Sequence, residues 1–204
     1  LVKVCGLTKR EDVLAADESG ADLLGFVLAD SPRRVEPSFI TSLPPTRALK
    51  IGVVALDPDS DDIPPEVFRL LKEGAIDALQ FHGRESPRFM EKFAAAGYKA
   101  LRPKSAEEAS ALPGPYPGPR ILVDAFSGEA LGGTGRRLAP EILAAVKSVP
   151  GSAPLWIAGG LSPANIRRVV GEWEPELVDL SSGLEESPGV KDRALMDTFF
   201  KELS

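Results

Sequence analysis

The stretch Leu155-Trp156-Ile157-Ala158-Gly159-Gly160 decides the fold class, because it is a short apolar run that ends abruptly at two glycines. Runs of about four to eight apolar residues between small or polar residues are typical of strands buried on both faces. Seven further runs of this kind occur along the chain: Val2–Gly6, Leu23–Leu28, Lys50–Leu56, Ala78–His82, Tyr98–Arg102, Ile121–Phe126 and Leu177–Ser182. Their spacing of roughly 20 to 30 residues is that of repeated strand–helix units.

Helix signals lie between several of these runs. The segment Thr8–Glu11 has the spacing of a capping box, and Gly20 is the expected end of the helix that follows. Ser162 and Pro163 have the pattern of an N-cap followed by the first helical residue. A third helix is expected within Asp62–Gly74.

Eight strand–helix units favour an α/β fold, namely a closed (β/α)8 TIM barrel that forms a single domain over residues 1–204. An open doubly wound sheet is the main alternative, but it needs fewer strands and usually an early glycine fingerprint, which does not follow the first run. Because 204 residues is near the lower limit for this barrel, at least one helix must be shortened or missing. The stretch Leu112–Pro119, rich in proline and glycine, is the expected place.

Composition excludes several classes of function. The net charge is −6 and no basic run occurs, so neither nucleic acid nor an anionic membrane surface is an expected partner. No apolar run approaches the ~18 residues of a membrane span, and Leu1–Val4 lacks the features of a signal peptide, so we expect a cytoplasmic protein. With one cysteine and one histidine, neither a disulfide framework nor a zinc site is expected. No metal or other cofactor is implied.

The chemistry of a (β/α)8 barrel is located at the C-terminal ends of its strands. Cys5, after the first run, and Asp124, in the sixth, are therefore the candidate acid–base pair. Taken singly, a cysteine here is more often a small buried hydrophobe, and an aspartate more often accepts hydrogen bonds in a turn. Gln80 and His82 close the fourth run, and Arg102 closes the fifth.

The last two strand ends have the pattern of a phosphate site. Gly159 and Gly160 follow one run, and Ser182 and Gly183 follow the next. Glycine lets the backbone approach a ligand closely, and exposed amides near a helix N-terminus attract an anion. Tight turn geometry alone would also explain each pair, but two pairs at adjacent strand ends favour phosphate binding.

Several motifs, taken in order, carry a family resemblance. They are Lys3-Val4-Cys5-Gly6-Leu7-Thr8, Gly20-Ala21-Asp22, Gly25-Phe26-Val27, Ser31-Pro32-Arg33-Arg34-Val35, Gln80-Phe81-His82-Gly83, Val123-Asp124, Gly132-Gly133-Thr134-Gly135, Ala158-Gly159-Gly160-Leu161, Asp179-Leu180-Ser181-Ser182-Gly183 and Pro188-Gly189-Val190-Lys191-Asp192. The chain resembles the phosphoribosylanthranilate isomerase family of tryptophan biosynthesis nearly from end to end. Arg136–Pro140 and the end of the fifth run, Lys99–Arg102, depart from the family pattern and put loop geometry in doubt.

The resemblance implies an Amadori rearrangement of N-(5′-phosphoribosyl)anthranilate to 1-(2-carboxyphenylamino)-1-deoxyribulose 5-phosphate. By position, Asp124 matches the general acid that protonates the ring oxygen, and Cys5 matches the general base that removes the C2′ proton. Arg34 matches the residue that holds the anthranilate carboxylate, with Arg33 beside it as the alternative.

We also assign Gln80, His82 and Gly133 to substrate binding. An ordinary thiol is only about 3% ionised at pH 7, so we expect a lowered pKa for Cys5. Asp124 has to hold a proton at the same pH, which calls for burial or a nearby anion.

Three other functions were weighed against this one. The analogous aminoaldose isomerase of histidine biosynthesis uses aspartate where this chain has Cys5. A non-catalytic phosphosugar-binding barrel would not need both Cys5 and Asp124, and an indole-forming lyase would need a catalytic lysine where Lys3 and Lys50 fit poorly. The expected partner is thus a small phosphosugar–anthranilate substrate, bound by a monomer or a homodimer.

Overall fold

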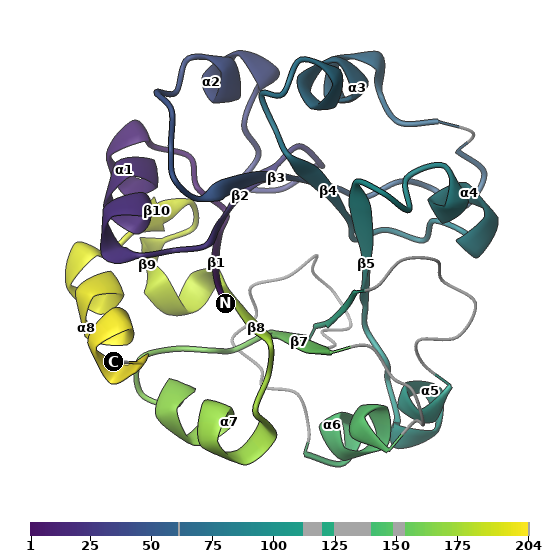
Figure 1. Ribbon diagram of the computed structural model, residues 1–204, viewed down its shortest axis with the longest axis vertical. Helices are drawn as coiled ribbons and strands as arrows, with labels where there is room; N and C mark the ends of the chain where they lie inside the picture. The colour runs from purple at the N-terminus through teal and green to yellow at the C-terminus, as the bar shows by residue number, and fades with distance from the viewer. Residues whose placement is uncertain (61, 112–119, 125–139, 149–153, 204) are drawn as a thin grey trace.

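A computed structural model describes residues 1–60, 62–111, 120–124, 140–148 and 154–203. Eight parallel strands close into a barrel in which each strand pairs with the next along the chain, and the last pairs with the first. In Figure 1 the strands form the inner ring and the helices lie outside it. The strands are β1 (Val2–Cys5), β2 (Leu23–Val27), β3 (Leu49–Val54), β4 (Ala78–Phe81), β5 (Gly97–Leu101), β6 (Ile121–Val123), β7 (Leu155–Ala158) and β8 (Leu177–Leu180). The predicted (β/α)8 barrel is confirmed.

The helices of the outer ring differ strongly in length. They are α1 (Arg10–Ser19), α2 (Pro37–Thr41), α3 (Pro65–Lys72), α4 (Pro87–Glu91), α5 (Ala106–Ser110), α6 (Pro140–Lys147), α7 (Ile166–Trp173) and α8 (Arg193–Leu203). Three of them, α2, α4 and α5, have only five residues each, which confirms the expected shortening. The stretch Leu112–Pro119, where we predicted it, lies outside the described residues.

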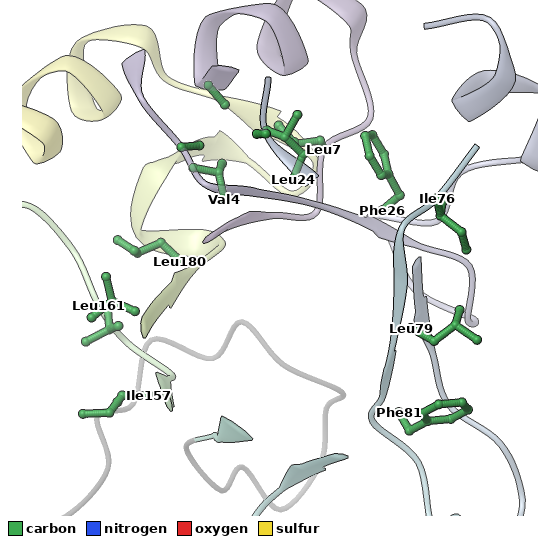
Figure 2. Close-up of a cluster of buried hydrophobic side chains, with 14 of the residues drawn as sticks. Val4, Leu7, Leu24, Phe26, Ile76, Leu79, Phe81, Ile157, Leu161 and Leu180 are labelled. Atoms are coloured by element: carbon green, nitrogen blue, oxygen red, sulfur yellow. The ribbon is translucent and has the colours of Figure 1, made fainter. Parts of the chain in front are cut away.

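Alternation along the strands separates two apolar cores. Inside the barrel, side chains such as Leu23, Tyr98 and Trp156 form one buried cluster. Their neighbours along the strands point outward and pack beneath the helices, where the larger cluster includes Val4, Leu24, Phe26, Leu79, Phe81, Ile157 and Leu180 (Figure 2). Both faces of each strand are therefore buried, which is why the strands read as continuous apolar runs.

Two of the predicted helix starts are wrong. The first helix begins at Arg10 with Lys9 as its N-cap and no side-chain cap, and the Thr8 hydroxyl donates to the carbonyl oxygen of Gly189. The predicted end at Gly20 is confirmed, since Gly20 adopts the left-handed conformation there. The helix expected to start at Ser162 begins at Ile166, after a hydrogen-bonded turn whose Ser162 carbonyl accepts from the Ile166 amide.

A short hairpin follows the barrel. After the 3₁₀ helix η1 (Ser182–Leu184), strands β9 (Glu185–Ser187) and β10 (Val190–Lys191) pair antiparallel. Figure 1 shows this hairpin beside β1 and α1. It therefore brings residues from the end of the chain back to the loops at its beginning.

Candidate active site

A pocket opens where the strands end, and it collects most of the residues predicted from the sequence. Cys5, Gln80, His82 and Asp124 line it together with both glycine-rich strand ends. The complete described lining is Cys5, Val27, Ala29, Asp30, Ser31, Arg33, Val53, Ala55, Gln80, His82, Asp124, Ala158, Gly159, Gly160, Leu161, Asp179, Ser181, Ser182 and Gly183. The candidate base, the candidate acid and the candidate phosphate loops thus share one pocket.

Cys5 ends β1 and lies against a glycine. Register pairs it with Gly25 on β2, where an added Cβ would come within 2.7 Å of the Cys5 Sγ and 3.0 Å of the Lys3 Cε. Real side chains essentially never approach so closely, so Gly25 makes room for both residues. Strand β2 therefore needs a residue without a side chain at this position, so that Cys5 can reach the pocket.

Lys3 lies two residues before Cys5 and is completely buried. Its Nζ donates to Asp179 Oδ2 at 2.6 Å and to Gln80 Oε1 at 2.8 Å. Burial by itself would lower the pKa of Lys3, but the Asp179 carboxylate, together with Cys5 and Tyr98, outweighs it and holds the pKa above its ordinary value. A permanent positive charge thus lies under the candidate base.

The expected lowering of the Cys5 pKa is wrong for the protein without substrate. Burial raises the pKa of the Cys5 thiol, because a thiolate loses its hydration there. Lys3 opposes this effect, while the Asp179 carboxylate adds to it. The sequence-based expectation rested on what the reaction demands of a base and did not include the cost of desolvation.

Asp124 directly follows β6 and is nearly buried. Its Oδ2 lies 3.0 Å from His82 Nε2 and 3.5 Å from Arg102 Nε. His82 and Arg102 follow β4 and β5, so three adjacent strand ends supply this cluster. Burial lowers the pKa of His82, and the hydrogen bond to Asp124 opposes the shift only in part, so the imidazole is neutral at pH 7.

The two candidate phosphate loops touch each other. An added Cβ at Gly183 would lie only 1.8 Å from the carbonyl oxygen of Leu161, so no other residue fits there without moving a loop. Gly159 and Gly160 have φ angles of 95° and 64°, in the left-handed region that favours glycine. Asn165 holds the first loop, because its amide donates to the Gly160 carbonyl at 2.9 Å.

The two neighbouring arginines differ in their surroundings. Arg33 lines the pocket, but its guanidinium is held by Glu185, with Nη2 2.6 Å from Oε2 and Nε 2.8 Å from Oε1. Arg34 is outside the described pocket lining, and its side chain is 51% exposed, with Glu36 3.6 Å away. Arg34 is thus the arginine with the more freely available guanidinium.

Lys191 on the hairpin is a second buried cation near Cys5. Its Nζ donates to the carbonyl oxygen of Cys5 at 2.6 Å and to Glu185 Oε1 at 2.8 Å. Burial alone would raise the pKa of Glu185, but Arg33 and Lys191 together bring it below its ordinary value. This charged cluster attaches the hairpin, and with it the Ser182–Gly183 loop, to the end of β1.

Sequence reasoning missed the roles of Lys3, Asp179 and Lys191. The alternation along β1 could have identified Lys3, because residues two apart share one face of a strand and Lys3 must share that of Cys5. Asp179 carried a signal too, as a charged residue inside an otherwise apolar run. Gly133, assigned to substrate binding, lies outside the described residues.

The described ranges lack two further kinds of feature. No group of three or more His, Cys, Asp or Glu side chains there could hold a metal ion. No helix in the same ranges is long and apolar enough to cross a membrane. What the described site offers is a thiol and a carboxyl facing one pocket with a glycine-lined end. Fold and site together define a (β/α)8-barrel enzyme of the acid–base class.

Comparison with known proteins identifies the family. The family model described as N-(5'phosphoribosyl)anthranilate (PRA) isomerase matches residues 2–202. The chain belongs to this family. A relative from Geobacter sp. (strain M21), named N-(5'-phosphoribosyl)anthranilate isomerase, is 40% identical over 98% of this chain and 96% of its own length. A relative of the same name from Pseudomonas putida (strain GB-1) is 36% identical over 98% of this chain and 95% of its own length.

Solved structures agree with this assignment. The phosphoribosyl anthranilate isomerase of Thermus thermophilus superposes with a TM-score of 0.82 at 31% identity, over 99% of this chain and 97% of that one. Another isomerase of this kind was solved in complex with reduced 1-(o-carboxyphenylamino)-1-deoxyribulose 5-phosphate. It has a TM-score of 0.75 at 29% identity, and the match covers 98% of this chain and 96% of that one.

Proposed function

We propose that this chain converts N-(5′-phosphoribosyl)anthranilate into 1-(2-carboxyphenylamino)-1-deoxyribulose 5-phosphate in tryptophan biosynthesis. Family membership supports this reaction over the related aminoaldose isomerisation of histidine biosynthesis. The observation that carries the proposal is that Cys5 and Asp124, from the separate strand ends of β1 and β6, line one pocket with both glycine-rich loops. The whole barrel is proposed to act as one catalytic domain.

Asp124 is the proposed general acid. Its proton passes to the ring oxygen of the ribose, the bond between that oxygen and C1′ breaks, and the nitrogen lone pair forms a protonated Schiff base. Asp124 is left as a carboxylate, with His82 Nε2 and Arg102 Nε 3.0 and 3.5 Å from its Oδ2. The negative charge that forms on the acid therefore meets polar groups that are already in place.

Cys5 is the proposed general base. As the thiolate it takes the proton from C2′, and the electron pair of that C–H bond moves toward the cationic nitrogen to give an enolamine. The enolamine then tautomerises to the ketone. Burial raises the pKa of the Cys5 thiol, and the positive charge of Lys3 beneath it counteracts this by stabilising the thiolate.

The remaining residues are proposed to hold the substrate. The phosphate is proposed to bind to the loop amides at Gly159, Gly160, Ser182 and Gly183, where the glycines carry no side chain and permit close approach. Arg34 is proposed to bind the anthranilate carboxylate, because the guanidinium of Arg33 is already held by Glu185. Gln80, His82 and Gly133 complete the proposed substrate-binding set.

We also infer a cytoplasmic location, because the proposed base is a free thiol and reducing compartments preserve free thiols. No cofactor is proposed. The assembly is proposed to be a monomer or a homodimer. A dimeric isomerase of the family is known from Thermotoga maritima, and monomers derived from it have been solved.

The test is turnover of freshly prepared phosphoribosylanthranilate, followed through the loss of its anthranilate-type fluorescence. Wild type is compared with Cys5→Ser and Asp124→Asn, and binding of a reduced product analogue is measured for all three. Rapid turnover by wild type and loss of at least about 100-fold in each variant, with analogue binding retained, supports the acid–base pair. A folded wild type that binds the analogue but does not turn over the substrate would favour a non-catalytic phosphosugar-binding barrel.

A further inference from the structure

His82 lies between Gln80 and Asp124, and each of them contacts a different nitrogen of its ring. Gln80 Nε2 is 3.3 Å from Nδ1, and Asp124 Oδ2 is 3.0 Å from Nε2. A neutral imidazole carries one proton, so one ring nitrogen donates and the other accepts. Which nitrogen holds the proton decides whether Asp124 receives a hydrogen bond or faces a lone pair.

The orientation of the Gln80 amide is settled by Lys3. Gln80 lies on β4 and is only 1% exposed. Lys3 Nζ is 2.8 Å from one terminal atom of its side chain, and the Tyr98 hydroxyl is 2.9 Å from the same atom. An ammonium group can only donate, so that atom must be the amide oxygen. The other terminal atom, which faces His82, is therefore the NH2 group.

The NH2 group of Gln80 in turn fixes the proton on His82. Because an amide nitrogen only donates, Nδ1 has to accept and the proton has to be on Nε2. In this tautomer Nε2–H points to Asp124 Oδ2. The opposite tautomer would set two N–H groups against each other at Gln80 and would leave Nε2 to accept from Arg102 Nε, 3.0 Å away. The Nε2–H tautomer in turn gives up the Arg102 contact, because Arg102 Nε can only donate, but Arg102 Nε also lies 3.5 Å from Asp124 Oδ2. The Nε2–H tautomer therefore keeps two contacts of His82 and loses one.

We propose that Gln80 is a positioning residue, which holds His82 in the Nε2–H tautomer so that His82 donates to the Asp124 carboxylate once the acid has given up its proton. The proposal rests on the proposed function of the same site. It changes the assignment of Gln80 from substrate contact to support of the acid, since Lys3, Tyr98 and His82 already engage both ends of its amide. The charge of Lys3 is thereby linked to Asp124 through two neutral side chains.

The consequence for catalysis follows from where charge develops. Both described polar contacts of Asp124 fall on Oδ2, from His82 and from Arg102. Oδ1 is then the oxygen left to carry the proton to the substrate. A hydrogen bond to a charged acceptor contributes enough that its loss slows the step about 10- to 100-fold.

The test uses the fact that His82 is the only histidine in the chain. In protein labelled with ¹⁵N-histidine, long-range proton–nitrogen NMR distinguishes a protonated ring nitrogen from an unprotonated one without ambiguous assignment. In the wild type at pH 7.5 we expect the proton on Nε2. In Gln80→Glu a carboxylate oxygen replaces the NH2 group, and we expect the proton to appear on Nδ1.

Two further variants keep the proposal testable if Gln80→Glu does not fold. Gln80→Met removes the donor without adding a charge, and we expect the preference for Nε2 to be lost. Tyr98→Phe is the matched control, because it removes one hydrogen bond to Gln80 Oε1 and leaves the one from Lys3, so the tautomer should stay as in the wild type.

Kinetics provide the second readout. For Gln80→Met we expect kcat to fall about 10- to 100-fold, with KM changed less than about threefold, and little further loss when it is combined with Asp124→Asn. A wild-type proton on Nδ1, or a Gln80→Met variant with an unchanged tautomer and rate, overturns the proposal. If the wild type has no isomerase activity but shows Nε2–H, the positioning of Asp124 is supported and the proposed function fails.

Discussion

Replacing Lys3 with methionine removes the buried positive charge beneath Cys5 that pairs with Asp179. Methionine has a similar length and no charge, so packing is largely preserved while the ion pair is lost. Asp179 would then keep no donor on Oδ2, and its Oδ1 is already without a partner among the described residues. A buried carboxylate would be left without compensation.

The size of the effect follows from burial. Lys3 is 0% exposed and Asp179 6% exposed at their side chains, and the two charges are 2.6 Å apart. Breaking a buried pair from one side costs about 3–5 kcal/mol in the free energy of unfolding. For a chain of 204 residues, about 1 kcal/mol shifts Tm by roughly 2–4 °C, so a decrease of about 6–20 °C is expected.

Thermal unfolding followed by circular dichroism measures this shift. The matched control is Arg193→Met, which breaks an ion pair of 3.0 Å whose two side chains are 55% and 56% exposed. Such a pair contributes at most about 0.5 kcal/mol, so Tm should fall by no more than about 2 °C. The double variant Lys3→Met/Asp179→Leu removes both charges and should recover much of the lost stability.

The reasoning fails if Lys3→Met and Arg193→Met lower Tm equally. It fails as well if the double variant is less stable than Lys3→Met by the full cost of a second, independent substitution. Either result would mean that the Lys3–Asp179 pair is not the dominant interaction of these two charges.

Three further predictions concern the pocket. Because burial raises the pKa of the Cys5 thiol, the rate at which iodoacetamide alkylates this single cysteine should still rise with pH beyond about 8.5. A rate that reaches a plateau below pH 8 would contradict the raised pKa. Gly183→Ala forces the two candidate phosphate loops apart and should raise KM at least about 10-fold, while the affinity for an analogue without phosphate stays constant. Arg34→Met should raise KM about 10-fold and leave Tm unchanged, because Arg34 is proposed to bind the substrate carboxylate. Arg33→Met removes a donor from Glu185 and should lower Tm by several degrees. Equal effects of the two variants on KM and Tm would reject the assignment.

The barrel could be predicted from local pattern because both faces of its strands are buried. Each strand then reads as a short apolar run, and the run ends where the backbone leaves the barrel. Several predicted runs extend one or two residues past the strands, as at His82 and Arg102, and these extra residues belong to the site. Helix starts were less predictable, because side chains near them also contact distant parts of the chain, as the hydroxyl of Thr8 contacts Gly189, which is 181 residues away.

The candidate acid and base could be predicted for a similar reason. In a closed parallel barrel all strands end on one face, so Cys5 and Asp124 had to lie around the same opening. The direction of the Cys5 pKa shift could not be predicted, since it depends on how far the thiol is removed from water. That quantity belongs to the assembled barrel and not to the residues next to Cys5 in the chain.

The sequence by itself determined the fold class, and it located the candidate acid, the candidate base and the candidate phosphate loops, because strand ends and glycines are local features. Only the tertiary structure decided what surrounds them. Lys3 meets Asp179 across 176 residues, and Arg33 meets Glu185 across 152. Such partners come together only when β8 pairs with β1 and the hairpin folds back. Closure of the barrel also removes water from these charges, and without water the attraction between paired charges is stronger.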